Sequence, residues 1–235
     1  MNKNLTIIQN NVTSIRPTET KELIKNFINK ENVDIAVLSE IWLKPDETIK
    51  FSGYKFVKHV RPAGYGGVGI LIKNEIVSKE VILPNLHPVE AIAIETTNTT
   101  PPLLIISIYI PPYPINNNDI NNPLKLLFDI IYKNNNATIL AGDFNAHHRS
   151  WNPHRRNCPR GELIDHFIQN SNLVLLNDGT STLIKEPHTE PSAIDLTFST
   201  GNIASKIEFF SNHRIIKYVI EETSTKYNYQ NIYIY

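Results

Sequence analysis

Short apolar segments rich in β-branched residues recur along the whole chain, and they constrain its fold more than any other feature. The clearest of them cover residues 33–38, 103–110 and 138–141. Apolar runs of about four to eight residues, bounded by polar or turn-forming residues, are typical of buried β-strands. Weaker runs of the same kind predict further strands at residues 5–11, 54–59, 67–72, 76–83, 91–95, 173–176, 193–198, 206–210 and 215–220.

Helical periodicity is confined to three segments. Thr18 is a candidate N-cap for a first helix, in which Leu23, Ile24, Phe27 and Ile28 fall on one face. The other two helices are expected at about residues 122–132 and 161–169. Many strands with few helices, in this order, predict an α/β fold in which two packed sheets are flanked by helices.

The 235 residues fit one large domain with a substantial core. Residues 1–222 contain all the predicted helices and strands, whereas residues 223–235 are polar and aromatic with no clear period. The sequence shows no internal repeat and no low-complexity linker. We therefore expect a single domain over residues 1–222, followed by a polar tail.

Charge and cysteine content limit the class of function. The formal net charge is zero, whereas proteins that bind nucleic acid tightly and nonspecifically usually carry a basic excess. An enzyme that holds a few phosphates and a metal ion is compatible with this balance. The single Cys158 suits a reducing compartment, the first residues lack the apolar core of a signal peptide, and no run is long enough to span a membrane. We expect an intracellular protein, nuclear or cytoplasmic, with no membrane partner.

Asp143 and Asn145 follow the apolar run at residues 138–141 and stand one residue apart. If strand periodicity extends through both, their side chains point the same way. A carboxylate and a carboxamide placed in this way can bind one phosphate together, since the first polarises a water and the second donates to a nonbridging oxygen. Gly-Asp and Asn are also common in turns, so a simple turn is the competing interpretation.

Other polar residues end or interrupt the predicted strands. Glu40 follows the run at residues 33–38, where an acid is either a solvated strand end or an oxygen ligand for Mg²⁺. Tyr109 lies late in an apolar strand, either as a core ring or as a hydroxyl that reaches a phosphate. Asp195 is embedded in a strand and needs a partner if it is buried. His213 is a candidate partner, because an Asp–His pair can orient an imidazole against a phosphate.

The order of these motifs resembles the endonuclease domain of non-LTR retrotransposons of the jockey and R1-like type. That domain is the apurinic-endonuclease-like branch of the endonuclease/exonuclease/phosphatase superfamily. The resemblance covers about residues 5–220, and the blocks around Glu40-Ile41-Trp42 and from Gly142 to His148 are the most specific. The matching blocks, in the family's order, are residues 7–11, 34–43, 66–70, 108–112, 142–148 with Trp151, and 192–197.

The resemblance implies a fold, a reaction and partners. The family fold is a four-layer α/β sandwich of the DNase I-like kind, with two mainly antiparallel sheets flanked by helices. Its reaction is the Mg²⁺-dependent (or Mn²⁺-dependent) hydrolysis of a DNA phosphodiester, which leaves a 3′-hydroxyl that primes reverse transcription. The expected partners are DNA and the reverse transcriptase domain of a parent element, and the domain itself is expected to be monomeric.

The resemblance also implies roles for individual residues. By these roles, Asp143 aligns or deprotonates the attacking water and Asp195 orients His213. The expected metal ligands are Asn11, Glu40 and Asn212, and the expected contacts of the scissile phosphate are Tyr109 and Asn145. His148 and Arg155 are further candidates for substrate binding at an edge beside Trp151, the alternative being a solvated basic loop next to a core tryptophan.

Three features depart from the family pattern: Asn10, Asn212, and the short stretch between Asp195 and His213, after which Arg214-Ile215 replaces a Phe-Pro. Asn10 stands where a tryptophan usually precedes the metal-binding asparagine, and Gln9 favours Asn11 as that asparagine. Asn212 replaces the aspartate of a terminal Ser-Asp-His, so a charge that supports the cation and the protonated His213 is lost, at a cost on the order of a few kcal/mol of transition-state stabilisation. Full activity, weakened activity and an inactive remnant that only binds DNA or a partner all stay open, as does a relative that hydrolyses another phosphate ester.

Overall fold

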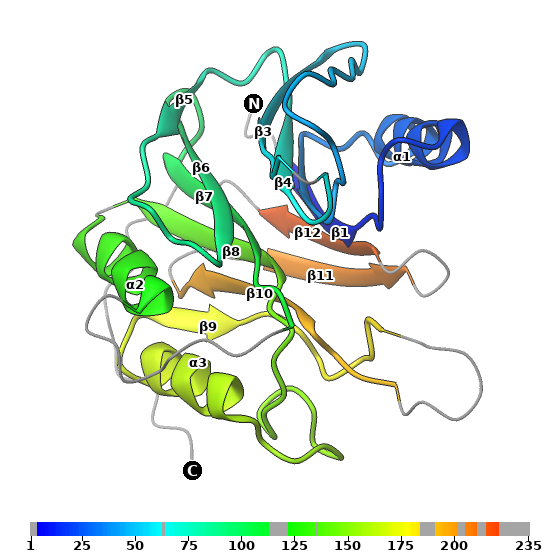
Figure 1. The fold of residues 1–235 in the computed structure, drawn as a ribbon. Coiled ribbons are helices and arrows are strands. Elements are labelled where there is room, and N and C mark those ends of the chain that lie inside the picture. The colour runs from blue at the N-terminus through cyan, green and yellow to red at the C-terminus, as the bar shows by residue number, and fades with distance from the viewer. Residues whose placement is uncertain are drawn as a thin grey trace.

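The computed structural model describes residues 4–62, 64–112, 122–134, 136–183, 191–201, 205–210 and 215–220, with the backbone alone for 205–210 and 218. Within these ranges the chain forms three helices and two six-stranded sheets, which stack face to face (Figure 1). Among the same residues, no helix is both long enough and apolar enough to cross a membrane. The predicted tail at 223–235 lies outside the described residues, as do Asn212 and His213.

The first sheet contains the N-terminal strands and the last two strands of the chain. Its parallel neighbours β1 and β2 lie at the centre, and all its other pairings are antiparallel. In spatial order the strands are β11 (Ser205–Phe210), β12 (Ile215–Ile220), β1 (Leu5–Asn11), β2 (Ile35–Ser39), β4 (Val68–Lys73) and β3 (Tyr54–His59).

The second sheet is built from the middle of the chain. Its parallel neighbours are β7 and β8, and the remaining pairs are antiparallel. In spatial order the strands are β5 (Ser78–Val81), β6 (Glu90–Thr96), β7 (Leu103–Tyr109), β8 (Ala137–Asp143), β10 (Asp195–Thr200) and β9 (Leu173–Leu175). The prediction of two mainly antiparallel sheets is confirmed.

The space between the sheets is filled by one apolar cluster. Because side chains alternate along a strand, Ile35 and Val37 of β2 face inward, toward Ile105 of β7 and Ile139 of β8. The Ser107 hydroxyl of β7 donates to the backbone oxygen of Leu38 in β2, at 2.9 Å. This packing fixes the spacing of the two sheets close to the strand ends that carry the candidate residues.

Helix α1 (Thr18–Lys30) covers the outer face of the first sheet, where Ile24 and Ile28 are buried. The prediction that Thr18 caps this helix is wrong, because Pro17 occupies the N-cap and Thr18 is the first helical residue. Leu23 was expected on the apolar face, yet it is 55% exposed. The buried stripe of α1 is therefore narrower than its sequence suggests.

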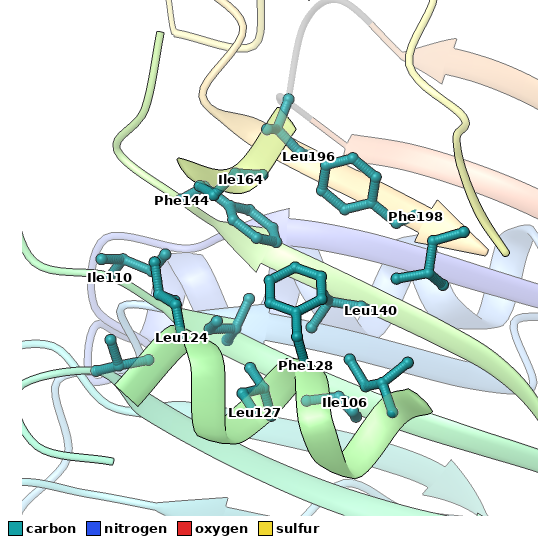
Figure 2. Close-up of a cluster of buried hydrophobic side chains, with 14 of the residues drawn as sticks. Ile106, Ile110, Leu124, Leu127, Phe128, Leu140, Phe144, Ile164, Leu196 and Phe198 are labelled. Atoms are coloured by element: carbon teal, nitrogen blue, oxygen red, sulfur yellow. The ribbon is translucent and has the colours of Figure 1, made fainter. Parts of the chain in front are cut away.

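Helices α2 (Pro123–Lys133) and α3 (Pro159–Gln169) cover the outer face of the second sheet. Figure 2 shows Leu127 and Phe128 of α2 facing Ile106 and Leu140 of the sheet. The side chain of Asn122 caps α2 by accepting from the backbone N–H groups of its first turn. With α1 on the opposite side, the layers run helix, sheet, sheet, helices (Figure 1), so the predicted four-layer α/β sandwich is confirmed.

Candidate active site

Four polar side chains form a row across one end of the second sheet. Tyr109 of β7 pairs with Glu90 of β6 on one side and with Asp143 of β8 on the other. Asp143 in turn pairs with Asp195 of β10. Residues directly opposite each other in neighbouring strands point to the same face of a sheet. Tyr109 packs in the cluster between the sheets, so the row faces the first sheet.

The first sheet places Asn11 and Glu40 against this row. Asn11 ends β1 and Glu40 follows β2, so parallel pairing brings both to the same edge. The Asn11 carboxamide nitrogen donates to Glu40 Oε1 at 3.0 Å and to Asp143 Oδ2 at 2.9 Å. The Asn11 amide therefore bridges Glu40, which the sequence predicts as a metal ligand, and Asp143, which it predicts to align the attacking water.

The register of β1 bears on the choice between Asn10 and Asn11. Ile7 packs between the sheets, whereas Ile8 packs against the layer of α1. By alternation, Gln9 and Asn11 face the second sheet and Asn10 faces away from it. Gln9 Nε2 indeed lies 3.4 Å from Asp195 Oδ1. The geometry thus favours Asn11, as Gln9 did in the sequence.

A sharp backbone turn presents Glu40. Both Glu40 and Trp42 adopt left-handed backbone conformations, with φ of +53° and +52°. The turn brings the Trp42 indole N–H back to Glu40 Oε2 at 3.1 Å, and the Trp42 and Tyr65 rings form a T-shaped contact. Such strain is retained where surrounding contacts hold it and is common at functional sites. Both oxygens of Glu40 are therefore positioned by neighbouring side chains.

The Asp143–Asn145 corner is a turn as well as a polar pair. Strand β8 ends at Asp143, and Asn145 has φ +43°, so strand alternation does not reach Asn145. The backbone N–H of Asn145 donates to Asp143 Oδ1 at 2.9 Å, and its side-chain nitrogen donates to the Ile110 oxygen at 2.9 Å. The two interpretations of this motif are therefore compatible, because the turn itself orients both side chains.

Burial, followed by the like charges of neighbouring carboxylates, dominates the electrostatics at this corner. Asp143 is 1% exposed. Burial raises the pKa of Asp143 well above its ordinary value, and the neighbouring charges of Asp195 and Glu40 add to the rise. Burial likewise raises the pKa of Tyr109, and Glu40 and Asp143 act in the same direction. The Tyr109 phenol is thus held in its protonated, hydrogen-donating form.

The donor set fits a hard divalent cation. Glu40 and Asp143 present carboxylate oxygens on either side of the Asn11 amide, and their like charges are of the kind that a cation neutralises. Within the described ranges, no group of three or more His, Cys, Asp or Glu side chains is arranged around a common metal position. Mg²⁺ is commonly bound by one or two carboxylates together with waters and substrate phosphates, and Glu40 and Asp143 offer carboxylates of that kind.

Two predicted substrate contacts lie elsewhere. His148 packs against Trp151, and its ring contacts Asp165 at 3.2 Å and Ser150 at 2.9 Å. These contacts hold His148 onto α3. Arg155 is half-buried in the loop before that helix. Burial lowers the pKa of His147, and the positive charge of Arg155 lowers it further, so the two side chains are near each other. The structure thus links these two residues to the α3 side of the fold rather than to the Asn11 bridge.

Sequence reasoning missed the pair of Glu90 and Arg61. Glu90 is buried, accepts from the Gly67 backbone N–H, and forms an ion pair with Arg61. The Arg61 guanidinium lies 5.9 Å from the centre of the Tyr109 ring, a favourable cation–π arrangement. The available signal was an acid at the start of a strand, since such a residue needs a partner when buried. This pair supports the Tyr109 side of the row.

Comparisons with known proteins agree with this geometry. A family described as "Endonuclease-reverse transcriptase" matches residues 103–217. The "RNA-directed DNA polymerase from mobile element jockey" of Drosophila melanogaster is 25% identical over 221 residues, which cover 89% of this chain and 23% of that protein. The "Probable RNA-directed DNA polymerase from transposon X-element" of the same fly is 27% identical, with 81% and 21% covered. The chain spans less than a quarter of the length of these relatives.

Solved structures share the whole fold. The endonuclease domain of TRAS1, a telomere-specific non-LTR retrotransposon, superimposes with a TM-score of 0.72 at 16% identity, covering 94% of this chain and 100% of that one. The AP endonuclease LMAP from Leishmania major gives 0.71 at 14% identity, covering 93% and 88%. The resemblance to non-LTR retrotransposon endonucleases that the sequence predicted is confirmed, and the fold is that of AP-endonuclease-like domains.

Proposed function

We propose that this chain is a Mg²⁺-dependent (or Mn²⁺-dependent) endonuclease domain that hydrolyses DNA phosphodiester bonds and leaves nicks. The observation that carries the proposal is the Asn11 amide that joins Glu40 and Asp143 across the two sheets. Similarity to retrotransposon proteins supports it. In a longer parent protein, the reverse transcriptase would extend the 3′-hydroxyl of the nick. The domain itself acts as a monomer inside the cell.

In this proposal, Asn11, Glu40 and Asn212 would hold the metal ion. When bound, a divalent cation stabilises the negative charge that develops on the phosphate. Asp143 is the group that orients the attacking water and receives its proton. Hydrogen bonds from Asn11 and from the Asn145 backbone fix its carboxylate. A carboxylate fixed in this way is already oriented for the reaction, which lowers the entropic part of the barrier.

Tyr109 and Asn145 bind the scissile phosphate. The raised pKa of Tyr109 keeps its hydroxyl protonated, so the hydroxyl donates to a nonbridging oxygen. Asn145 uses one hydrogen of its carboxamide nitrogen on the Ile110 oxygen, and the second hydrogen serves the phosphate, since a carboxamide has two. Both donors act on oxygens that gain charge as the bond to the leaving group breaks.

Asp195 orients His213 in this scheme. His213 precedes Ile215 by two residues, and Ile215 pairs with Asn10 of β1. The adjacent Gln9 reaches Asp195, so the start of β12 and the Asp195 carboxylate belong to the same end of the sandwich. With Asn212 in place of an aspartate, the imidazolium has one charge fewer to support it, and we propose an activity weaker than that of the family pattern.

Nicking of supercoiled plasmid tests the proposal. The wild-type chain should produce open circles with Mg²⁺ and none with EDTA. Asp143→Asn should lower the rate by about 10²-fold or more, whereas Asp129→Asn, an exposed acid on α2, should not change it. Equal rates for wild type and Asp143→Asn would refute the assigned role.

If the wild-type chain fails to nick, two further variants and two probes identify the reason. Asn212→Asp should raise the rate if the weakness lies in the missing charge, and adding Asp143→Ala to that variant should abolish it. Turnover of bis-p-nitrophenyl phosphate without nicking would instead indicate another phosphate ester as substrate. DNA binding with neither activity would indicate a binding remnant and overturn the proposal.

A further inference from the structure

Arg160 is a buried cation that lies behind the candidate site. Its side chain is in the first turn of α3, and the residue is only 9% exposed. Its Nη1 donates to the backbone oxygen of Asn145 at 2.8 Å and to that of Phe144 at 3.3 Å. Its Nη2 donates to the backbone oxygen of Pro111 at 2.8 Å. One guanidinium therefore joins the two segments that follow β7 and β8.

These two segments carry residues of the proposed reaction. Tyr109 ends β7 just before the Pro111 segment, and Asp143 ends β8 just before Asn145. Two more bonds cross between the segments, from Ile110 N–H to the Asp143 oxygen at 2.8 Å and from the Asn145 side chain to the Ile110 oxygen. Arg160 adds its own bonds to both segments, and one of them is accepted by the backbone oxygen of Asn145, the residue with the left-handed conformation.

The location of Arg160 is unfavourable for a cation by ordinary rules. The N-terminus of a helix carries a partial positive charge and disfavours cations. Burial lowers the pKa of Arg160, while Cys158, Asp143 and Tyr109 act in the opposite direction. Neither helix stability nor solubility accounts for an arginine here. Its carbonyl acceptors and the attraction of Asp143 do account for it.

The contacts also require the shape of arginine. A guanidinium offers five N–H donors in a rigid planar fork, whereas lysine offers one compact ammonium group. Arg160 uses different nitrogens for the two segments, so the fork sets their separation. A lysine could satisfy one segment and would leave the other without its donor.

We propose that Arg160 is a positioning residue of the active site, which fixes the segments after β7 and β8 so that Tyr109 and Asn145 meet the same phosphate. It acts through the backbone and contacts no DNA. The inference rests on the proposed endonuclease function and adds to it a residue that a search for ligands and acids at strand ends does not find.

Plasmid nicking with Mg²⁺ tests this role through the split between kcat and KM. Arg160→Gln and Arg160→Lys should each lower kcat by on the order of 10²-fold, the size expected for a displacement of about 1 Å at the reacting groups. KM should change far less than kcat, since the displaced Tyr109 and Asn145 donors act mainly on charge that develops in the transition state. Arg156→Gln removes the same charge from an exposed position in the preceding loop and should leave kcat unchanged. Millimolar guanidinium should partly restore Arg160→Ala.

Hydrogen exchange provides a readout that does not depend on activity. In Arg160→Gln, the amides of Tyr109, Ile110 and residues 143–146 should exchange faster, while those of β1 and α1 should exchange as in the wild type. Wild-type kcat together with wild-type exchange would overturn the proposal. Faster exchange throughout the fold would also overturn it, because Arg160 would then support folding alone. If the wild-type chain does not nick DNA, the endonuclease function fails, while the exchange result still decides whether Arg160 holds the two segments.

Discussion

Gly142 offers a direct test of how tightly the strands that deliver Asp143 are packed. It lies in β8, pairs with Ile108 of β7, and has φ +149°. A Cβ atom at this position would lie 1.9 Å from the Ile108 backbone oxygen and 2.8 Å from its carbonyl carbon. Ordinary contacts between heavy atoms are near 3.5 Å, so a Gly142→Ala variant must separate β7 and β8 locally by roughly 1.5 Å.

The size of the effect follows from two costs. Forcing extra volume into a packed interior costs about 1–3 kcal/mol, and a side chain at positive φ costs about 1–2 kcal/mol. Together they amount to roughly 2–5 kcal/mol, a large share of the roughly 5–15 kcal/mol that stabilises a typical domain. For a chain of this length, the melting temperature should fall by about 10 °C.

Gly53→Ala is the matched control. Gly53 has φ +82°, and a Cβ atom there would meet nothing within 4 Å, so only the backbone cost applies. Thermal melts of both variants distinguish the cost of the clash with the neighbouring strand from the cost of a side chain at positive φ. Nicking assays should then be run at a temperature where both variants are folded. Gly142→Ala should also lose nicking, because Asp143 and Tyr109 form the next pair along the same strands. Identical melting temperatures for the two variants would refute the packing argument.

Two other predictions concern the charges of the site. Because the folded pKa of Asp143 is raised, its contribution to stability is full below its unfolded value of about 4 and is lost as pH rises through the folded pKa. In EDTA, urea melts should therefore show that the free energy of unfolding of the wild type falls as pH rises. The fall should be less steep in Asp143→Asn, and parallel curves for the two proteins would contradict this sign. Trp42→Phe keeps a ring against Tyr65 but removes the N–H that donates to Glu40. The Mg²⁺ concentration for half-maximal nicking should rise by about 10-fold, and an unchanged midpoint would show that this bond does not position the ligand.

The strands were predictable where an apolar run has clear ends. β7 was expected at residues 103–110 and is observed at Leu103–Tyr109, because proline residues bound the run. β5 was expected at 76–83 but covers only Ser78–Val81 at a sheet edge, where Ile82 is 95% exposed. β10 begins later than predicted, since the Asn152 side chain takes both backbone groups of Ala193. A side chain 41 positions away in sequence leaves no trace in a local pattern.

The candidate site was predictable to the level of strand ends. Parallel strands deliver their carboxyl ends to one edge, so the meeting of Asn11 and Glu40 follows from the order of elements. The supports of that site did not follow. The return of Trp42 to Glu40 depends on two left-handed residues, and the burial of Arg160 depends on three loops meeting. These contacts are set by tertiary packing, which residue types and periodicity do not encode.

The bridge from Asn11 to Asp143 joins residues 132 positions apart, and its two ends belong to different sheets. Neither sheet alone contains both the proposed metal ligands Asn11 and Glu40 and the proposed water-aligning Asp143. Loop closure over such a separation is among the slow steps of folding, because the chain loses conformational entropy before the long-range contacts form. Cation binding should consequently appear only after the two sheets have docked. The rate at which binding is recovered during refolding should therefore report the docking of the two sheets, and not the formation of either sheet alone.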